Sequence, residues 1–393
     1  MPSSVPSIYI PEIKFLRPDV SIWLMYSGRN RIFLKDFQEK GVVFLNTPGF
    51  DAKENTFKNT ALIARHTNMS AHISDWLNGK AEKNPSRIPE SYDENPILTD
   101  VNAARIFSAE LGNIKRLFVE AKVGDIVISP GKSPFDPLLV GEITHDWRKE
   151  DDYKVPHLAG EIVPCRKVAW LQNVLLKKDF SIDLAKRLQN RQAITKIDNK
   201  FYNEILDCIY PAYSRGNRSK LDIFGDNYTG NDPMQPYESA SLIKYLMASS
   251  FAFENGEIED FATLDFEAAV DKYYDKDRVI DFKQNFNSPG AYSLIVKSSI
   301  AVLIVSSGLI LATSVGGGIT FDQSVKAAQM SPGKSSGEID KNSLSQENDN
   351  YLNSLRGKKG SEILMQKGKK SNDTMPLSLD NTYQLGIRRD SLK

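Results

Sequence analysis

Residues 123–130, Val-Gly-Asp-Ile-Val-Ile-Ser-Pro, carry the clearest structural signal in the chain. Gly124 and Asp125 are residue types that favour a tight turn, and a short apolar run follows them directly. A second block, Val140-Gly-Glu-Ile143, has a similar apolar character. We therefore expect a buried strand over residues 126–128 that starts at a turn and pairs with a strand containing residues 141–143.

Short β-rich runs and two helical patterns surround this stretch. The expected strands are residues 22–26, 42–45, 125–128, 138–143, 157–163 and 166–174, and the expected helices are residues 59–78 and 101–119. This layout predicts a small, closed or nearly closed β structure with flanking helices. Beyond Lys177 the pattern becomes helical, over residues 181–192, 198–210, 239–253 and 264–274, so we expect a domain boundary near Leu176.

Six short blocks follow one another in an order that is typical of a known domain. They are Trp23-Leu-Met-Tyr-Ser-Gly-Arg29, Phe33-Leu-Lys-Asp-Phe37, Gly41-Val-Val43, the stretch from Val123 to Pro130, Val140-Gly-Glu-Ile143 and Arg166-Lys-Val-Ala-Trp170. The series resembles the PUA-like domains of the EVE and YTH kind, particularly the version at the front of Mrr-type restriction proteins. The resemblance covers about residues 20–176, two-fifths of the chain.

The resemblance implies a pocket that holds a modified or unpaired nucleobase, or a nucleotide, between aromatic walls. It places Trp23, Tyr26, Ser27, Arg29 and Asn30 at the mouth of the pocket, and it suggests Phe50, Asp51, Ser129 and Trp147 for walls and edge contacts. Trp23 and Trp170 also fit ordinary core positions, because both lie in β-rich runs. By analogy with restriction-type proteins, the implied role is antiviral defence, that is, defence against foreign DNA.

Composition and the absence of known motifs argue against several other functions. Fifty basic and fifty acidic side chains cancel, so nonspecific duplex binding by the whole chain is not expected. No Glu-x-Lys triplet of a nuclease core follows Leu176, and no phosphate-binding P-loop, GxSxG or HExxH motif is present. Two cysteines and four histidines show no zinc-ligand spacing. We expect neither a catalytic centre nor a metal or cofactor.

An uncharged run extends from Ser298 to Phe321, and about 20 apolar residues suffice to cross a bilayer. The sequence thus predicts a transmembrane helix within residues 291–322, unless the run is a buried core helix or two core strands, since Val and Ile are frequent in it. Gly308, Ala312 and Gly316 recur every fourth residue, a spacing that lets membrane helices approach closely, and so predict a homo-oligomer. The start of the chain has no signal-peptide pattern, so we expect the preceding domain to be cytoplasmic and the protein to lie in the cytoplasmic membrane.

The expected architecture is α+β: a PUA-like small β-barrel with flanking helices over residues 1–176, a helical domain over 177–290, one transmembrane helix, and a disordered polar tail over 323–393. A polar loop at residues 214–236 is a candidate contact for a protein partner. The expected function is a membrane-anchored sensor of a nucleobase or nucleotide. The alternatives are a soluble nucleic-acid processing protein and a membrane scaffold for a partner.

Overall fold

The chain forms two compact units. In the computed structural model, unit 1 comprises Met1–Pro18 and Tyr210–Lys393, and unit 2 comprises Asp19–Ile209. The structure describes residues 13–96, 101–133, 135–171, 175–225, 234–285, 290–316, 335–336, 341–375 and 377–379. Unit 2 is thus an insertion in the chain of unit 1, and residues 177–209, which we expected in a separate helical domain, belong to unit 2.

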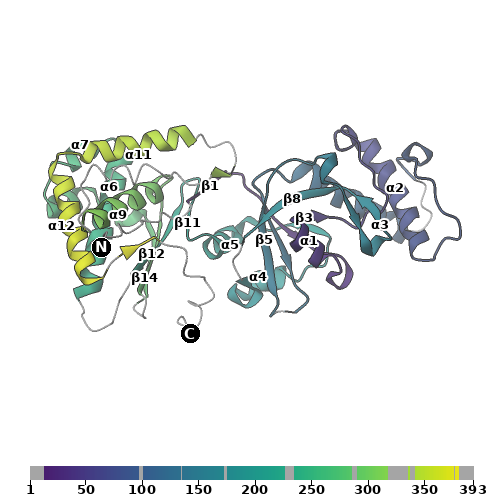
Figure 1. Ribbon diagram of the computed structural model, residues 1–393, viewed down its shortest axis with the longest axis horizontal. Coiled ribbons are helices and arrows are strands. Elements are labelled where there is room, and N and C mark those ends of the chain that lie inside the picture. Colours follow the sequence, from purple (N-terminus) through teal and green to yellow (C-terminus); the bar gives the residue numbers. More distant parts are fainter. Residues whose placement is uncertain are drawn as a thin grey trace, which may run out of the picture. The chain divides into compact units, whose positions relative to one another are not determined.

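Unit 2 is built on an open sheet with the strand order β10-β2-β4-β5-β8-β3 and with β9 beside β5 (Figure 1). Strands β2 and β4 are parallel, and the other pairs are antiparallel. The bounds are β2 Ile22–Met25, β3 Val42–Phe44, β4 Ile126–Pro130, β5 Pro137–Ile143, β8 Cys165–Trp170, β9 Leu175–Leu176 and β10 Ile194–Lys196, with a separate hairpin of β6 Tyr153–Val155 and β7 Glu161–Val163. The described strands do not close into the expected barrel, because β10 and β3 remain as edges.

The turn at Gly124 and Asp125 is confirmed and fixes the start of two strands. Gly124 has a positive φ of 81°, and its N–H donates to the carbonyl of Ile143 on β5 at 2.8 Å. The buried carboxylate of Asp125 accepts from the backbone N–H of Ser21 at 3.0 Å and from the indole Nε1 of Trp23 at 2.8 Å. One side chain therefore joins β2 to β4 at the end where both strands begin.

Helices cover the strands of unit 2. Their bounds are α1 Leu34–Lys40, α2 Thr60–Leu77, α3 Val101–Lys115, α4 Ile182–Arg187 and α5 Tyr202–Ile209. The two longer helices, α2 and α3, contact each other, and both were expected from their apolar spacing. Helix α2 begins where expected because the side chain of Asn59 accepts from the backbone N–H of Ala61 at 2.9 Å.

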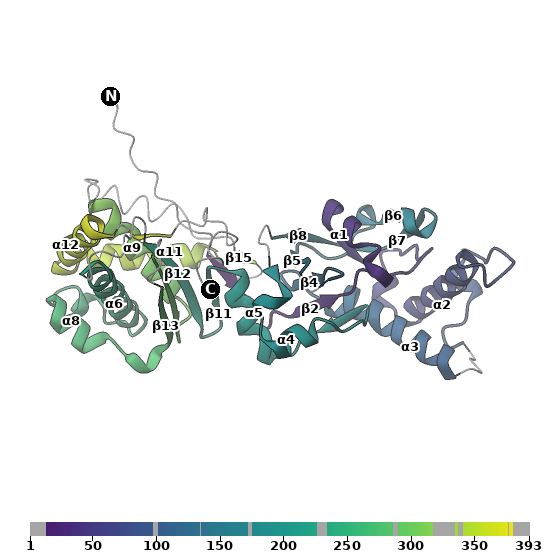
Figure 2. The same cartoon turned by 90° about the horizontal axis from the view of Figure 1, so that it is seen from below.

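Unit 1 contains a second sheet with helices on one face. The strand order is β13-β14-β12-β11-β1-β15, with β16 beside β12. The bounds are β1 Lys14–Leu16, β11 Ala212–Arg215, β12 Ser219–Gly225, β13 Val279–Asn285, β14 Gly290–Val296, β15 Ser335–Ser336 and β16 Leu377–Ser378. Figures 1 and 2 show α6 (Met234–Glu254), α9 (Ala301–Gly316) and α12 (Lys359–Thr374) gathered beside β12–β14. The remaining helices are α7 Ile258–Phe261, α8 Phe266–Tyr273 and α11 Lys341–Leu355.

Residues 301–316 of the apolar run that we expected to cross a membrane form the central helix of unit 1, and residues 317–321 lie outside the described residues. In α9 every side chain from Ala301 to Val305 and from Leu309 to Ala312 is buried, and the helix contacts α6, α11 and α12. A helix that is apolar all round is equally suited to the core of a protein. No helix in the described part of the chain has the length and apolarity to cross a membrane. The predicted transmembrane helix and the single-pass membrane localisation are therefore wrong.

The small residues of α9 allow close packing, but the packing is within unit 1. A Cβ atom added at Gly308 would lie 2.4 Å from Cδ2 of Leu246 on α6. Ala312 faces Gly368 of α12, where an added Cβ would lie 2.1 Å from the Ala312 carbonyl oxygen. Gly316 is the last residue of the helix. The spacing that predicted association between membrane helices therefore serves contacts between helices of one chain.

The expected disordered tail contains the two last helices. In α11, Leu344, Tyr351, Leu352 and Leu355 are buried, so a few apolar residues at helical spacing are enough to attach a mostly polar segment to the core. The expected helical domain, residues 177–290, is also different, because it contains the strands β10 to β13. The expected polar loop at 214–236 is largely the end of β11, the strand β12 and the start of α6, and residues 226–233 lie outside the described residues.

Candidate functional site

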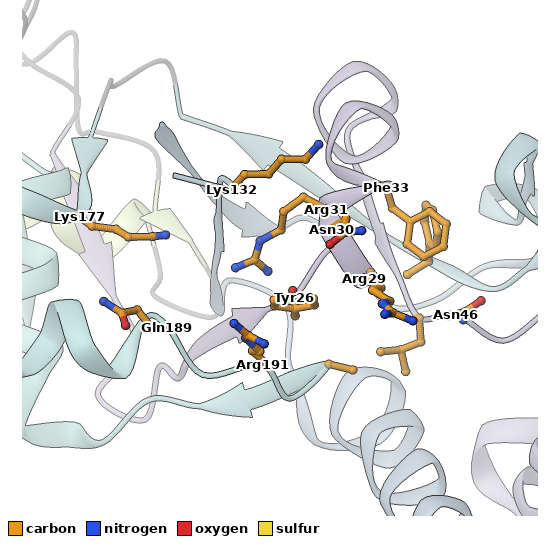
Figure 3. A pocket seen from close by; sticks show the side chains of 14 residues that line it. Tyr26, Arg29, Asn30, Arg31, Phe33, Asn46, Lys132, Lys177, Gln189 and Arg191 are labelled. Carbon is orange, nitrogen blue, oxygen red and sulfur yellow. The ribbon is translucent and has the colours of Figure 1, made fainter. Parts of the chain in front are cut away.

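Unit 2 contains an open cavity of about 1140 Å³. It is lined by Tyr26, Gly28, Arg29, Asn30, Arg31, Phe33, Phe44, Leu45, Asn46, Lys132, Lys177, Gln189, Arg191 and Ala193. Figure 3 shows the ring of Tyr26 at the centre of these side chains. The volume slightly exceeds the range of about 300 to 1,000 Å³ that is usual for small-molecule pockets, so the cavity has room for a ligand as large as a nucleotide.

The turn after β2 builds one wall of the cavity. Gly28 has a φ of 74°, and an added Cβ would lie 2.6 Å from the ring of Phe33, so this position needs glycine. Asn30 and Arg31 also have positive φ angles of 58° and 60°. Such angles are uncommon for side chains other than glycine and cluster at functional sites, where the surrounding structure holds them in place. Here the backbone N–H of Arg31 donates to the carbonyl of Gly28 at 2.9 Å.

This backbone places Arg31 over an aromatic ring. The guanidinium carbon of Arg31 lies 3.6 Å from the ring centroid of Tyr26. Its Nη1 is buried and has no hydrogen-bond partner among the described residues. Burial lowers the pKa of the guanidinium, and the neighbouring charge of Arg191 lowers it further, while Tyr26 acts in the opposite direction. Arg31 therefore holds a donor without a described partner beside the ring of Tyr26.

The opposite walls come from segments far away in the sequence. Lys132 follows β4, Lys177 follows β9, and Gln189 and Arg191 precede β10. Lys177 is buried, and its Nζ donates to the carbonyl of Gly131 at 3.4 Å. Burial lowers the pKa of Lys177, the charge of Arg31 lowers it further, and Asp136 partly opposes both effects. The chain segment after Leu176 thus completes the lining of the cavity.

The cavity is strongly cationic. Arg29, Arg31, Lys132, Lys177 and Arg191 line it, and no lining residue among those described is acidic. None of these five side chains forms an ion pair with a carboxylate in the described part of the chain. The chain as a whole carries no net charge, so this is a local concentration of positive charge. A concave site with one sign of charge attracts ligands of the opposite sign.

Three of the predicted pocket residues line the cavity, namely Tyr26, Arg29 and Asn30. Trp23 does not line it, because its side chain is 2 % exposed and lies in the core. Ser27 and Ser129 are fully buried, and no described residue is a hydrogen-bond partner for either hydroxyl. The cavity thus contains three residues of the predicted pocket mouth. None of the residues predicted for its walls and edge contacts lines it.

Phe50 and Trp147 belong to an aromatic cluster, which we define as Phe50, Phe57, His66, Phe118 and Trp147. His66 stacks on Phe50 with ring centroids 4.6 Å apart, and Phe57 stacks on Phe118 at 4.3 Å. Asp51 lies beside this cluster and forms an ion pair with Lys149. These rings pack on one another, so the cluster stabilises unit 2.

Sequence reasoning missed most of the cations. Arg31 was visible beside the glycine turn, but an arginine in a turn is usually solvated. Lys177, Gln189 and Arg191 lie beyond the expected domain boundary, so the sequence prediction places them in a different domain from the N-terminal strands. No protein-family model, no curated protein and no solved structure matches this chain.

Proposed function

We propose that unit 2 binds an unpaired nucleobase together with its phosphate, presented by a single-stranded nucleic acid or by a nucleotide. The observation that carries the proposal is the cavity with five cationic side chains, no acidic lining residue among those described, and the Tyr26 ring at its centre. Phosphate supplies the negative charge that this site lacks, and a nucleobase supplies a flat face for stacking.

The pair of Tyr26 and Arg31 offers such a flat surface. In proteins that recognise unpaired bases, the bases stack on aromatic rings or on the planes of guanidinium groups. The Arg31 guanidinium lies over one face of Tyr26, so a base can stack on the outer face of Arg31 or replace it on the ring. Both arrangements need a base that has left its duplex, because a base inside a duplex is already stacked on its neighbours.

Amide side chains at the rim suit the edge of a base. Asn30, Asn46 and Gln189 line the cavity and are exposed. Each amide carries donors and an acceptor, which is the combination that reads the hydrogen-bonding edge of a nucleobase. A role in defence against foreign DNA is part of this proposal only through the resemblance to restriction-type domains.

The proposal is tested by fluorescence anisotropy with labelled oligonucleotides of one sequence, as single-stranded DNA, single-stranded RNA and duplex DNA, and by competition with free nucleotides. We expect a single strand or a nucleotide to bind, and the duplex to bind much more weakly. Binding of all forms with equal affinity, or of none, would contradict the proposal.

Replacing Tyr26 with alanine should weaken binding by about 1 to 3 kcal/mol, the range for one lost stacking partner. Tyr26→Phe keeps the ring and should bind nearly as well as the unchanged protein. Tyr237→Ala is the matched control, because Tyr237 is an exposed tyrosine of unit 1 and lies outside the cavity. Unchanged affinity of Tyr26→Ala, in a protein that melts normally, would exclude Tyr26 from the site.

A further inference from the structure

One side of the cavity gathers three cations from three separate segments. Figure 3 shows the end groups of Arg31 and Lys177 turned toward the same space beside Tyr26, with Gln189 and Arg191 along its lower side. Arg31 comes from the turn after β2, Lys177 from the segment after β9, and Arg191 from the segment before β10. The fold therefore brings these charges together, whereas their positions in the sequence do not.

These three charges repel one another. Arg191 lowers the pKa of Arg31, and Arg31 lowers the pKa of Lys177, in both cases in addition to the effect of burial. The carboxylate whose charge reaches Lys177 is that of Asp136, and it already accepts a hydrogen bond from the backbone N–H of Ser133 at 2.7 Å. Like charges held close together raise the free energy of the empty site, and an anion between them removes that cost.

The donor groups on this side of the cavity point to one kind of anion. Arg31 has a buried Nη1 without a described partner, and an arginine fork is suited to bind two oxygens of one phosphate. Lys177 adds a compact charge that is 6 % exposed, and Gln189 adds an amide donor. A phosphate inside a nucleic-acid strand carries one negative charge, whereas a terminal phosphate carries about 1.5 to 2 at neutral pH. Three cations match the terminal group better.

We propose that Arg31, Lys177 and Arg191 form a subsite for a terminal phosphate, so that unit 2 prefers the phosphorylated end of a strand or a nucleotide with a free phosphate. This inference rests on the proposed function and adds to it the orientation of the ligand in the cavity. The terminal phosphate lies on the Lys177 side of Tyr26, and the base lies toward Asn46 on the opposite side, which Figure 3 shows beyond Arg29.

The test uses the full chain and one oligonucleotide in three forms, with a 5′-phosphate, with a 3′-phosphate, and with neither. We expect one phosphorylated form to bind about ten-fold to a hundred-fold more tightly than the unphosphorylated form, as one or two charged hydrogen bonds would give. Lys177→Met and Arg191→Gln should reduce the ratio between the two affinities to about one, even where they also weaken binding of the unphosphorylated strand. Lys154→Met is the control, since Lys154 is exposed and lies outside the cavity.

The outcomes separate the two proposals. Tight binding of the single strand with no effect of either terminal phosphate would overturn the subsite and leave the proposed function intact. If no oligonucleotide binds, thermal unfolding in the presence of pyrophosphate tests whether the subsite alone binds a phosphate group. Pyrophosphate should then raise the melting temperature of the unchanged protein but not of Arg191→Gln, and equal shifts in both proteins would overturn the subsite. Arg191 is exposed, so this variant should fold normally.

Discussion

Replacing Gly368 with alanine should lower the free energy of unfolding by about 3 kcal/mol, near the upper end of the usual cost of overpacking. The added Cβ would lie 2.1 Å from the carbonyl oxygen and 2.5 Å from the carbonyl carbon of Ala312. These are backbone atoms of the buried helix α9, so α9 and α12 must move apart to make room. In an open helical position the same change would instead gain about 1 kcal/mol, because alanine favours helix more than glycine does.

Gly112 in α3 provides the matched control. Its nearest atom to an added Cβ is Nη1 of Arg116 at 3.8 Å, which is an ordinary contact with a flexible side chain. Gly112→Ala should therefore leave the stability unchanged or raise it. Urea unfolding of both variants measures the difference. Equal midpoints for Gly368→Ala and the unchanged protein would show that the close approach of α9 and α12 is not as described.

His66 should make unit 2 less stable in mild acid. Its side chain is 4 % exposed, it stacks on Phe50, and no described residue is a hydrogen-bond partner of its Nδ1. Burial lowers the pKa of His66 to about 4, and the smaller effects of the surrounding charges come from Asp51, Glu90, Lys53 and Lys149. The imidazole is therefore neutral in the folded protein throughout the mildly acidic range.

The sign of the effect follows from the order of proton binding. The unfolded chain binds a proton at His66 near the ordinary pKa of 6.5, whereas the folded chain binds it only near 4. Stability is therefore lost as the pH falls from about 6.5 to about 4, at about 1.4 kcal/mol per unit, and reaches a loss of about 3 kcal/mol. Urea midpoints between pH 7 and pH 4 measure this loss.

The contribution of His66 is the part that disappears in His66→Gln, because glutamine does not titrate. His72→Gln is the control, since His72 is exposed. Identical pH profiles of His66→Gln and the unchanged protein would mean that His66 is accessible to protons in the folded state.

The sheet of unit 2 was largely predictable because its signals are local. The turn at Gly124 and Asp125, the strand after it and the helices α2 and α3 follow from residues within one or two turns of each other. Closure of the barrel was not predictable in this way, because it depends on whether the edge strands β10 and β3 meet. Four strands of unit 1 were missed because β11 to β13 were assigned to a helical region and nearly all of β14 to the membrane segment.

The error over α9 has a general physical cause. A run without charges indicates only that its side chains are buried away from water. Both a lipid bilayer and a protein core provide such an environment. The polar helices α11 and α12 that cover α9 contain few apolar residues, so the cover was not recognised from the sequence. The cavity was predicted only in part, since Lys177 and Arg191 belong to it through long-range folding.

The position of β1 determines the order in which the two units can fold during synthesis. Residues Lys14–Leu16 leave the ribosome before unit 2, yet their parallel partners are β11, Ala212–Arg215, and β15, which both follow the whole of unit 2. Unit 2 is continuous in the chain and can assemble as soon as its last residue has emerged, whereas β1 must wait unpaired while the whole of unit 2 is translated. An unpaired strand edge is a site for wrong associations, so β1 is exposed to them at least until β11 has emerged.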